Sequence, residues 1–515
     1  MVGVLSGPFS CRVSMRSRDW FSIDGLQTKW REMVIPSWLI SVLAHIAVLF
    51  VLSMLVMDTN SSEVIADLAT ELAQIPERPN LDEIQIDPLP LELPQTLDIP
   101  APEAPVAASV AVVDAVVEVA AKSPVDMPAM DNLADLLNGL NPSGMAAKGE
   151  GGSLNFRGAG MKAAMVGHQG GTKQTEQAVH AGLDWLMRHQ YSDGHWSLHQ
   201  FPCRQGRCTG EGKARYDMAA TAFGLLPYLA AGYTHQSGPY QKQVAAGLKW
   251  MLAHQDQNSG SLAADVGNNM YVHGLASIVL AEGYALTHDQ QLGKAAQLAI
   301  RFIESAQSPI HGGWRYVPRS ETGDTSVVGW QVMALKSAQM GGLQVNPQSL
   351  EGAKKFLKSV TSGSKGGYFG YDQPGNSPAM TSVGLLCQQY MGAVRGDEGI
   401  REGVEYIKTN PPTLSYRNCY YWYYATQVMH NMQGSEWDRW NREMRTIWVE
   451  TQARDRDKCD FGSWDPEKPT KDLGHTEQGG RVMLTSIGLL TLEVYYRYLP
   501  LYKIMGDSEV ASTAR

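Results

Sequence analysis

The stretch SPIHGGWRYVPRSETGDTSVVGWQVMALKSA, which runs from Ser308 to Ala338, contains the unit from which most of the chain is built. It starts with a Gly-Gly-Trp turn and a polar loop, and an apolar segment with helical spacing begins near Asp324. The segment before the turn, residues 298–307, also has apolar residues at helical spacing. The unit is therefore a helix, a Gly-aromatic turn, a loop and a second helix.

This unit occurs six times along the C-terminal two-thirds of the chain. The first helix of each unit carries an aromatic residue, at Trp185, Trp250, Phe302, Phe356, Tyr406 and Trp448. The turn residues follow at Trp196, Leu262, Trp314, Tyr368, Tyr416 and Trp464, which are 48 to 66 positions apart. Five second helices share a glycine, at Gly224, Gly274, Gly329, Gly384 and Gly488.

The number and regularity of the hairpins predict a closed ring. A glycine inside a helix costs about 1 kcal/mol relative to alanine, so five in register indicate close packing between helices. Six regular hairpins fit a closed double ring better than an open solenoid with polar caps. We therefore expect an all-α fold, an (α/α)6 toroid over residues 175–505, followed by a disordered tail over residues 506–515.

Three segments resemble known toroid families. QYSDGHW, Gln190 to Trp196, fits the Q-x3-G-x-W repeat of squalene cyclases, and ETGDTSVVGW resembles the segment where those cyclases carry D-x-D-D-T. NCYYWYY, Asn418 to Tyr424, resembles the D-x-C-Y-S-F-W segment of protein prenyltransferase β subunits. The resemblance covers roughly residues 175 to 505. It implies the α/α toroid of this superfamily and an isoprenoid-type ligand in a central cavity.

The same resemblance gives candidate catalytic residues. Asp324 occupies the last Asp of D-x-D-D-T and Glu321 the first, but Gly323 stands where the cyclases have their proton donor. In the prenyltransferase segment Arg417 replaces the zinc-binding Asp beside Cys419, so no metal and no other cofactor is expected. Asp324 also has a structural interpretation as a helix N-cap. The same interpretation applies to the residues expected just before the other second helices, Asp217, Asn269, Ser377 and Asn418.

Candidate binding residues lie on or before the second helices. Tyr421, Trp422 and Trp330 either line a cavity for an apolar guest or fill the core. His273 is expected to be an interior, hydrogen-bonded histidine or a binding residue. Because (α/α)6 rings also include polysaccharide-acting enzymes, which need acidic groups across a groove, Asp217 and Glu477 are further candidates.

Two cysteines lie in an insert of the first unit, FPCRQGRCTGEGKA. Outside the cytoplasm a local disulfide between Cys203 and Cys208 is expected. A zinc cluster with His195 and His199 is the alternative, although the cysteine spacing is not a standard one for zinc.

The N-terminal third predicts a membrane anchor and a tether. Residues 1–33 are basic and expected in the cytoplasm, and residues 34–57 contain a 23-residue stretch without formal charge. At 1.5 Å per residue that stretch measures about 35 Å, enough for one membrane span. Residues 58–174 are expected to be a disordered linker, with sixteen acidic and two basic residues between positions 58 and 140. The toroid is thus placed in the periplasm, anchored to the inner membrane.

The predicted span contains Ser41 and His45, one helical turn apart. This S-x3-H pattern resembles the anchor of TonB-type energy transducers and implies coupling to a proton-motor membrane complex. The alternative is a neutral histidine that pairs with a neighbouring helix. The net charge of −9 gives no indication of nucleic-acid binding. We expect a ligand-binding or scaffolding ring, or alternatively an isoprenoid cyclase or transferase-type enzyme or a polysaccharide-acting enzyme.

Overall fold

The computed structural model describes residues 157, 159–203 and 208–502, all within the compact unit Val112–Arg515. The predicted membrane span, with Ser41 and His45, lies outside the described residues, as do most of the predicted linker and the tail. Among the residues that are described, no helix combines the length and the apolar character that a membrane span requires.

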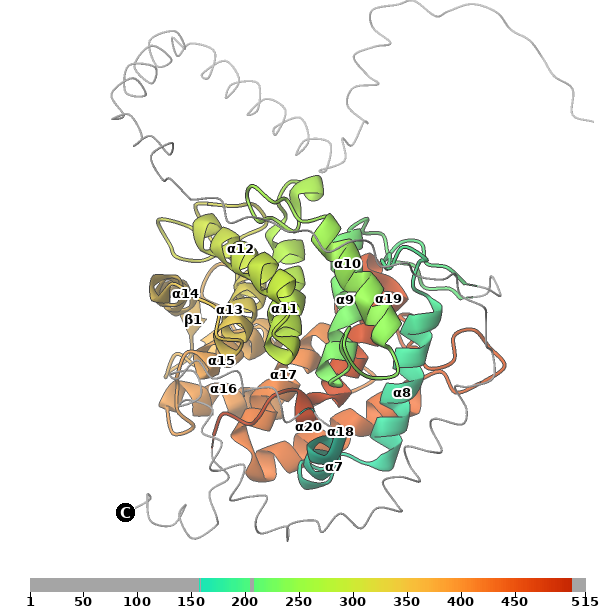
Figure 1. Cartoon of the computed structure of the whole chain (residues 1–515). Coiled ribbons are helices and arrows are strands. Elements are labelled where there is room, and N and C mark those ends of the chain that lie inside the picture. The colour runs from blue at the N-terminus through green and yellow to red at the C-terminus, as the bar shows by residue number, and fades with distance from the viewer. Residues whose placement is uncertain (1–156, 158, 204–207, 503–515) are drawn as a thin grey trace, which may run out of the picture. The chain divides into compact units, whose positions relative to one another are not determined.

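Six buried helices form the inner layer of a ring (Figure 1). They are α9 (Asp217–Ala230), α11 (Met270–Thr287), α13 (Thr325–Met340), α15 (Pro378–Tyr390), α17 (Cys419–Met432) and α19 (Thr476–Leu492). Each of these helices contacts the next one along the chain, and α19 contacts α9. The contacts therefore close the ring, which confirms the predicted toroid of six hairpins.

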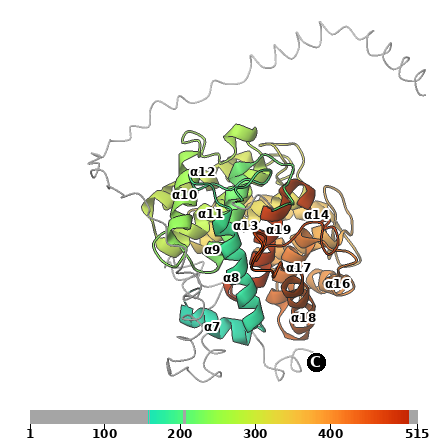
Figure 2. The same cartoon turned by 90° about the vertical axis from the view of Figure 1, so that its right-hand side faces the viewer.

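Six amphipathic helices form the outer layer (Figure 2). They are α8 (Lys173–Arg188), α10 (Gln241–Ala253), α12 (Gln290–Ala306), α14 (Pro347–Ser359), α16 (Glu398–Lys408) and α18 (Gly434–Thr451). In α16 the buried residues are Ile400, Gly403, Val404 and Ile407, one stripe at helical spacing. Helices α10 to α18 each pack on the inner helix before them, and α8 packs on α19. The first hairpin is thus held against the last.

Shorter elements complete the ring. They are the 3-10 helix η3 (Ala264–Val266), the antiparallel strands β1 (Thr361–Ser362) and β2 (Tyr368–Phe369), and the helices α7 (Ala159–His168) and α20 (Val494–Arg497). Helix α7 falls within residues predicted to be a disordered linker. It is ordered because Met165 is fully buried and because the helix packs on α20. The linker prediction therefore extends too far toward the ring.

Inner helices begin largely as the sequence predicts. Asn269, Asp324, Ser377 and Asn418 are N-caps whose side chains accept backbone N–H groups of the first turn. Asp217 is different, since Tyr216 occupies the N-cap position and Asp217 is the first helical residue.

The shared glycines mark close packing, as expected. A Cβ atom on Gly224 would lie 2.4 Å from the ring of Trp196, and one on Gly384 would lie 2.3 Å from the ring of Phe369. These aromatic residues come from the turns of the same units. A side chain larger than hydrogen would force the ring away from its inner helix.

Replacing Gly224 with alanine is therefore expected to destabilise the protein by about 1–3 kcal/mol through overpacking, although alanine is the better helix former. Trp196 cannot move easily, because it is fully buried and its Nε1 donates to the carbonyl oxygen of Leu186 at 2.9 Å. Urea unfolding followed by circular dichroism would measure the change. Gly283→Ala is the control, since its Cβ would lie 3.3 Å from the flexible end of Leu292. Equal effects of the two substitutions would contradict the packing argument.

Candidate functional site

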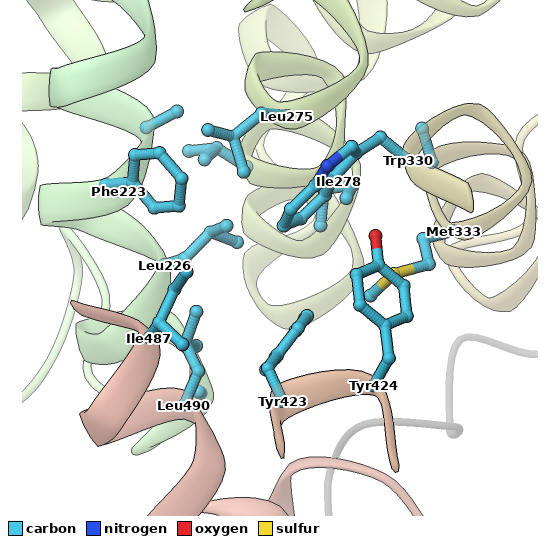
Figure 3. Packing of buried hydrophobic residues seen from close by; sticks show 14 of the residues in the cluster. Phe223, Leu226, Leu275, Ile278, Trp330, Met333, Tyr423, Tyr424, Ile487 and Leu490 are labelled. Atoms are coloured by element: carbon cyan, nitrogen blue, oxygen red, sulfur yellow. The ribbon is translucent and has the colours of Figure 1, made fainter. Parts of the chain in front are cut away.

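Aromatic and aliphatic side chains meet at the centre of the ring (Figure 3). Trp330 of α13 packs edge-on to Phe223 of α9, with ring centroids 6.4 Å apart. The same indole stacks on Tyr423 of α17 at 5.9 Å and meets Tyr424 edge-on at 5.7 Å. These helices are not neighbours in the ring, so their side chains touch across it. At this level the centre is a packed core, and Trp330 is one of its members rather than the wall of an open cavity.

At one end of the ring, a buried ion network joins the C-terminal part of α11 to Arg157, before α7, and to Arg497, at the end of α20. Glu282 of α11 accepts from Arg157 Nη1 at 2.8 Å and from Arg497 Nη2 at 3.1 Å. All three side chains are at most 2% exposed. The hydroxyl of Tyr498 donates to Glu282 Oε1 at 2.5 Å, and Arg497 Nη1 donates to the hydroxyl of Tyr423 at 2.8 Å. The network fills this end of the ring with paired charges.

The loops that precede the inner helices lie together at the opposite end, which we call the mouth. They are joined in two groups by backbone hydrogen bonds, from Met270 N to Tyr316 O and Thr325 N to Tyr371 O in one group, and from Leu473 N to Arg417 O and Lys213 N to Glu477 O in the other. These bonds connect the starts of α11 and α13 with the loops that follow them in the ring. They also connect the starts of α19 with the loops before α17 and α9. The mouth therefore consists of two joined arcs, one over the second to fourth units and one over the fifth, sixth and first.

Tyrosines gather at the mouth, one for each of five units; we call Tyr216, Tyr271, Tyr316, Tyr371 and Tyr416 the tyrosine rim. Tyr416 is 54% exposed, Tyr316 43% and Tyr216 37%. The rings of Tyr271 and Tyr316 stack with centroids 6.5 Å apart, and the hydroxyls of Tyr316 and Tyr371 lie 2.6 Å apart. The rim thus presents aromatic surface to solvent, a feature of binding surfaces.

Charged pairs lie beside these tyrosines. Arg315 Nη2 is 3.2 Å from Asp372 Oδ2, and its Nη1 donates to the hydroxyl of Thr322 at 2.8 Å. Lys213 Nζ is 2.5 Å from Glu477 Oε1, and both side chains are more than half exposed. The mouth therefore combines ring faces with hydrogen-bonding groups of both charges.

Asp324 has the geometry of a helix cap. It is fully buried, and its Oδ1 accepts from Val327 N at 2.9 Å and from the hydroxyl of Ser326 at 2.6 Å. Burial raises the pKa of Asp324, while these two hydrogen bonds act in the opposite direction. Glu321 is exposed in the loop before it. The two proposed catalytic acids therefore lie in different environments.

The position of the cyclase proton donor is closely packed. A Cβ on Gly323 would lie 2.9 Å from the Cα of Gly313 and 2.9 Å from the ring of Phe356. An aspartate side chain at this position would require both neighbours to shift. The glycine is thus part of the packing of the turn, and the local backbone does not leave room for the missing acid.

The other predicted binding residues are dispersed. His273 is fully buried, its Nδ1 accepts from Leu262 N and its Nε2 donates to Ala299 O, each at 3.0 Å. Burial lowers the pKa of His273 to about 4, so this histidine is neutral. Tyr421 and Trp422 face the outer helix α18, where they meet Trp440 and Trp448 edge-on. Of the predicted set, Asp217 and Glu477 belong to the loops and helix starts at the mouth.

The expected disulfide is replaced by another arrangement. Cys203 and Cys208 are not bonded to each other, and Cys208 Sγ lies 3.0 Å from Cys459 Sγ. The sequence favoured the local pair because both cysteines lie in one insert, and nothing in it points to Cys459, which is 251 residues away from Cys208. His195, which the sequence offered as a zinc ligand, instead pairs with Asp193, its Nδ1 lying 2.6 Å from Asp193 Oδ1.

No family model and no curated protein matches the chain. Among solved structures it is similar to the GH76A alpha-1,6-mannanase from Salegentibacter sp. HEL1_6, at 12% identity over 62% of this chain and 98% of that one, with a TM-score of 0.45. It is also similar to the type II terpene cyclase MstE from Scytonema, at 12% identity over 63% and 98% of the two chains, with a TM-score of 0.42. A third is the cellobiose 2-epimerase from Spirochaeta thermophila DSM 6192, at 12% identity over 65% and 98%, with a TM-score of 0.45. The closed set of helix contacts, rather than these similarities, establishes the toroid.

Proposed function

We propose that this chain is a membrane-tethered, periplasmic binding ring that holds a polysaccharide at its mouth, without cyclase chemistry. The observation that carries the proposal is the exposure of the rim tyrosines on a ring whose centre is packed. An isoprenoid ligand would need a deep apolar cavity with an acid or a metal at its end. The side chains around Trp330 occupy that place, and Gly323 stands where the acid would be.

An extended sugar chain matches the mouth in chemistry. Sugar rings present C–H faces that pack on aromatic side chains, and their hydroxyls need donors and acceptors nearby. The tyrosine rim supplies the former, and Arg315 with Asp372 and Lys213 with Glu477 supply the latter. Exposed Arg319 adds positive charge to the same loop as Tyr316, which favours an acidic sugar.

Replacing Tyr416 or Tyr316 with alanine is expected to weaken polysaccharide binding by roughly tenfold, since loss of one aromatic contact costs about 1–1.5 kcal/mol. The measurement is isothermal titration of the purified full chain with a soluble neutral mannan and with polygalacturonate. Tyr416→Phe keeps the ring and serves as the matched control, so it should bind like the wild type. Binding that alanine and phenylalanine reduce equally, or that neither changes, would rule out ring-face contact at this rim.

A scaffold that transmits force is the second candidate, because the predicted membrane span carries Ser41 and His45. In that case His45→Ala should abolish function while the chain still inserts and binds its ligand. A wild-type phenotype of this variant would remove the proton-motor partner from the proposal.

A further inference from the structure

Three side chains of the metal-ligand type converge where the first hairpin meets the last, and a fourth, Cys459, contacts one of them. His189 follows α8, Cys203 and Cys208 lie between α8 and α9, and Cys459 lies between α18 and α19. The ligand atoms of His189, Cys203 and Cys208 all lie within 4.8 Å of one another. Cys208 Sγ is 3.3 Å from His189 Nε2 and 3.0 Å from Cys459 Sγ. Two sulfurs and one imidazole nitrogen thus surround one point, and Cys459 Sγ adjoins them through its contact with Cys208.

The tautomer of His189 is set for ligation. Its Nδ1 lies 2.7 Å from the carbonyl oxygen of Trp185, which can only accept a hydrogen bond. Nδ1 must therefore carry the proton, and the lone pair of Nε2 points toward Cys208. A metal-bound histidine typically has this arrangement, with its other nitrogen donating to a backbone carbonyl. The imidazole is also held by stacking on Trp185, at 4.2 Å between centroids.

Contacts outside the cluster hold both loops in place. After Cys208, Gly212 N donates to Leu198 O at 2.8 Å and Ala214 N donates to Gln478 O at 3.0 Å. After Cys459, Arg188 Nη2 donates to the carbonyl oxygen of Phe461 at 2.7 Å. The segments after Cys208 and Cys459 are therefore held by contacts outside the cluster, which favours a preorganised site.

A buried arginine lies between the two loops. Arg481 is 1% exposed; its Nε donates to Thr209 O at 2.5 Å, and its Nη2 is 2.7 Å from Asp465 Oδ2. Three thiolates and one zinc ion have a combined charge of −1. The guanidinium bonds the residue after Cys208 in the chain, so its charge, shared with Asp465, partly offsets that of the site.

We propose that His189, Cys203, Cys208 and Cys459 form a structural Cys3His zinc site that closes the seam of the ring. Zinc prefers this ligand set, in a tetrahedron with Zn–S bonds of about 2.3 Å, which places ligand sulfurs about 3.8 Å apart. His189, Cys203 and Cys208 already lie within 4.8 Å of one another, whereas Cys459, 3.0 Å from Cys208, would have to move toward the other ligands to complete the tetrahedron. Four protein ligands leave no open position, so the ion would join the hairpins rather than act in catalysis.

The test is the metal content of the full chain, purified under reducing conditions with zinc present. Native mass spectrometry and elemental analysis should give one zinc per chain, and cobalt substitution should give the sulfur-to-cobalt charge-transfer absorption of a thiolate site. Cys459→Ser should weaken zinc affinity by at least about tenfold, while Cys459→His, which retains a ligand, should restore most of it. Because Cys459 is only partly buried, both variants should keep the helical circular-dichroism spectrum.

Cys387→Ala is the control, since this cysteine is buried in α15 and its loss should leave one zinc bound. The proposal fails if the wild-type chain binds no zinc under these conditions. It also fails if peptide mapping of the chain as first isolated finds a disulfide between Cys208 and Cys459, or if Cys459→Ser binds zinc as tightly as the wild type.

Discussion

Replacing Glu282 with alanine is expected to destabilise the folded ring by about 3–5 kcal/mol, because it leaves two buried arginines without their shared counter-ion. Arg157 and Arg497 both bond to this carboxylate, and neither has access to water. Arg157 also donates to the carbonyl oxygens of Leu229 and Arg497. The loss should therefore loosen α7 and α20 together with the end of α9. Guanidinium unfolding followed by circular dichroism would measure it.

The carboxylate of Glu282 also makes the stability of the folded state depend on pH. Burial by itself raises the pKa of Glu282, but the charges of Arg497 and Arg157 outweigh it and hold that pKa at about 2. The pKa of an unfolded glutamate is about 4.3, so the folded state binds its proton less tightly. The stabilisation is complete above about pH 4.3 and decreases as the pH falls toward 2. In the alanine variant this part of the acid dependence should disappear.

Glu477→Ala is the matched control, since Glu477 is an exposed glutamate paired with exposed Lys213. It should leave the unfolding midpoint almost unchanged because solvent screens such pairs. If Glu282→Ala were as mild as Glu477→Ala, the buried network would not contribute to the stability of the ring.

Replacing Trp330 with alanine is expected to cost about 3–5 kcal/mol and to leave a cavity at the centre of the ring. The indole is 1% exposed and is in contact with Phe223, Tyr423 and Tyr424 from the helices opposite. The neighbouring side chains could fill this cavity only in part, because they belong to different helices that the closed fold holds apart. Thermal unfolding would show the loss of stability.

A cavity with apolar walls binds small apolar molecules, so the Trp330→Ala variant should gain stability from benzene or xenon. The wild-type protein, whose centre is packed, should gain none. Tyr316→Ala is the control for loss of an aromatic side chain, since Tyr316 is exposed at the mouth and should be nearly neutral for stability. A wild-type protein that benzene stabilised to the same extent would indicate an open centre and restore the isoprenoid interpretation.

The repeat and the ring were predictable from the sequence because their signals are local. An aromatic turn residue and an N-cap side chain each act within one hairpin, whereas two of the shared glycines, Gly274 and Gly329, pack on the next inner helix. Gly224 packs on Trp196 of its own unit, and Asn269, Asp324, Ser377 and Asn418 cap the helices that they precede. Six repeats of one unit then leave few ways to bury every inner helix, and closing the ring is the most complete one.

The direction of side chains on the inner helices depended on the tertiary structure. In α17 all fourteen residues are buried, so hydrophobic periodicity does not distinguish the side facing the centre from the side facing the outer layer. Trp422 therefore faces α18, whereas Tyr423 faces Trp330 across the ring. The aromatic residues predicted to line one cavity therefore lie in two separate parts of the core, one against the outer helix and one at the centre of the ring.

Sites assembled from distant segments also depended on the fold. Cys203 and Cys208 are close in sequence, but the residues that complete their surroundings are His189 at the end of α8 and Cys459 from the last hairpin. Their meeting follows from the closure of the ring, which brings α8 against α18 and α19. By itself, the sequence determined the unit, its number of copies and four caps of the inner helices, because these rest on short-range contacts. Only the tertiary structure decided what fills the centre, what lies at the mouth and which cysteines meet, because these contacts join residues from different hairpins.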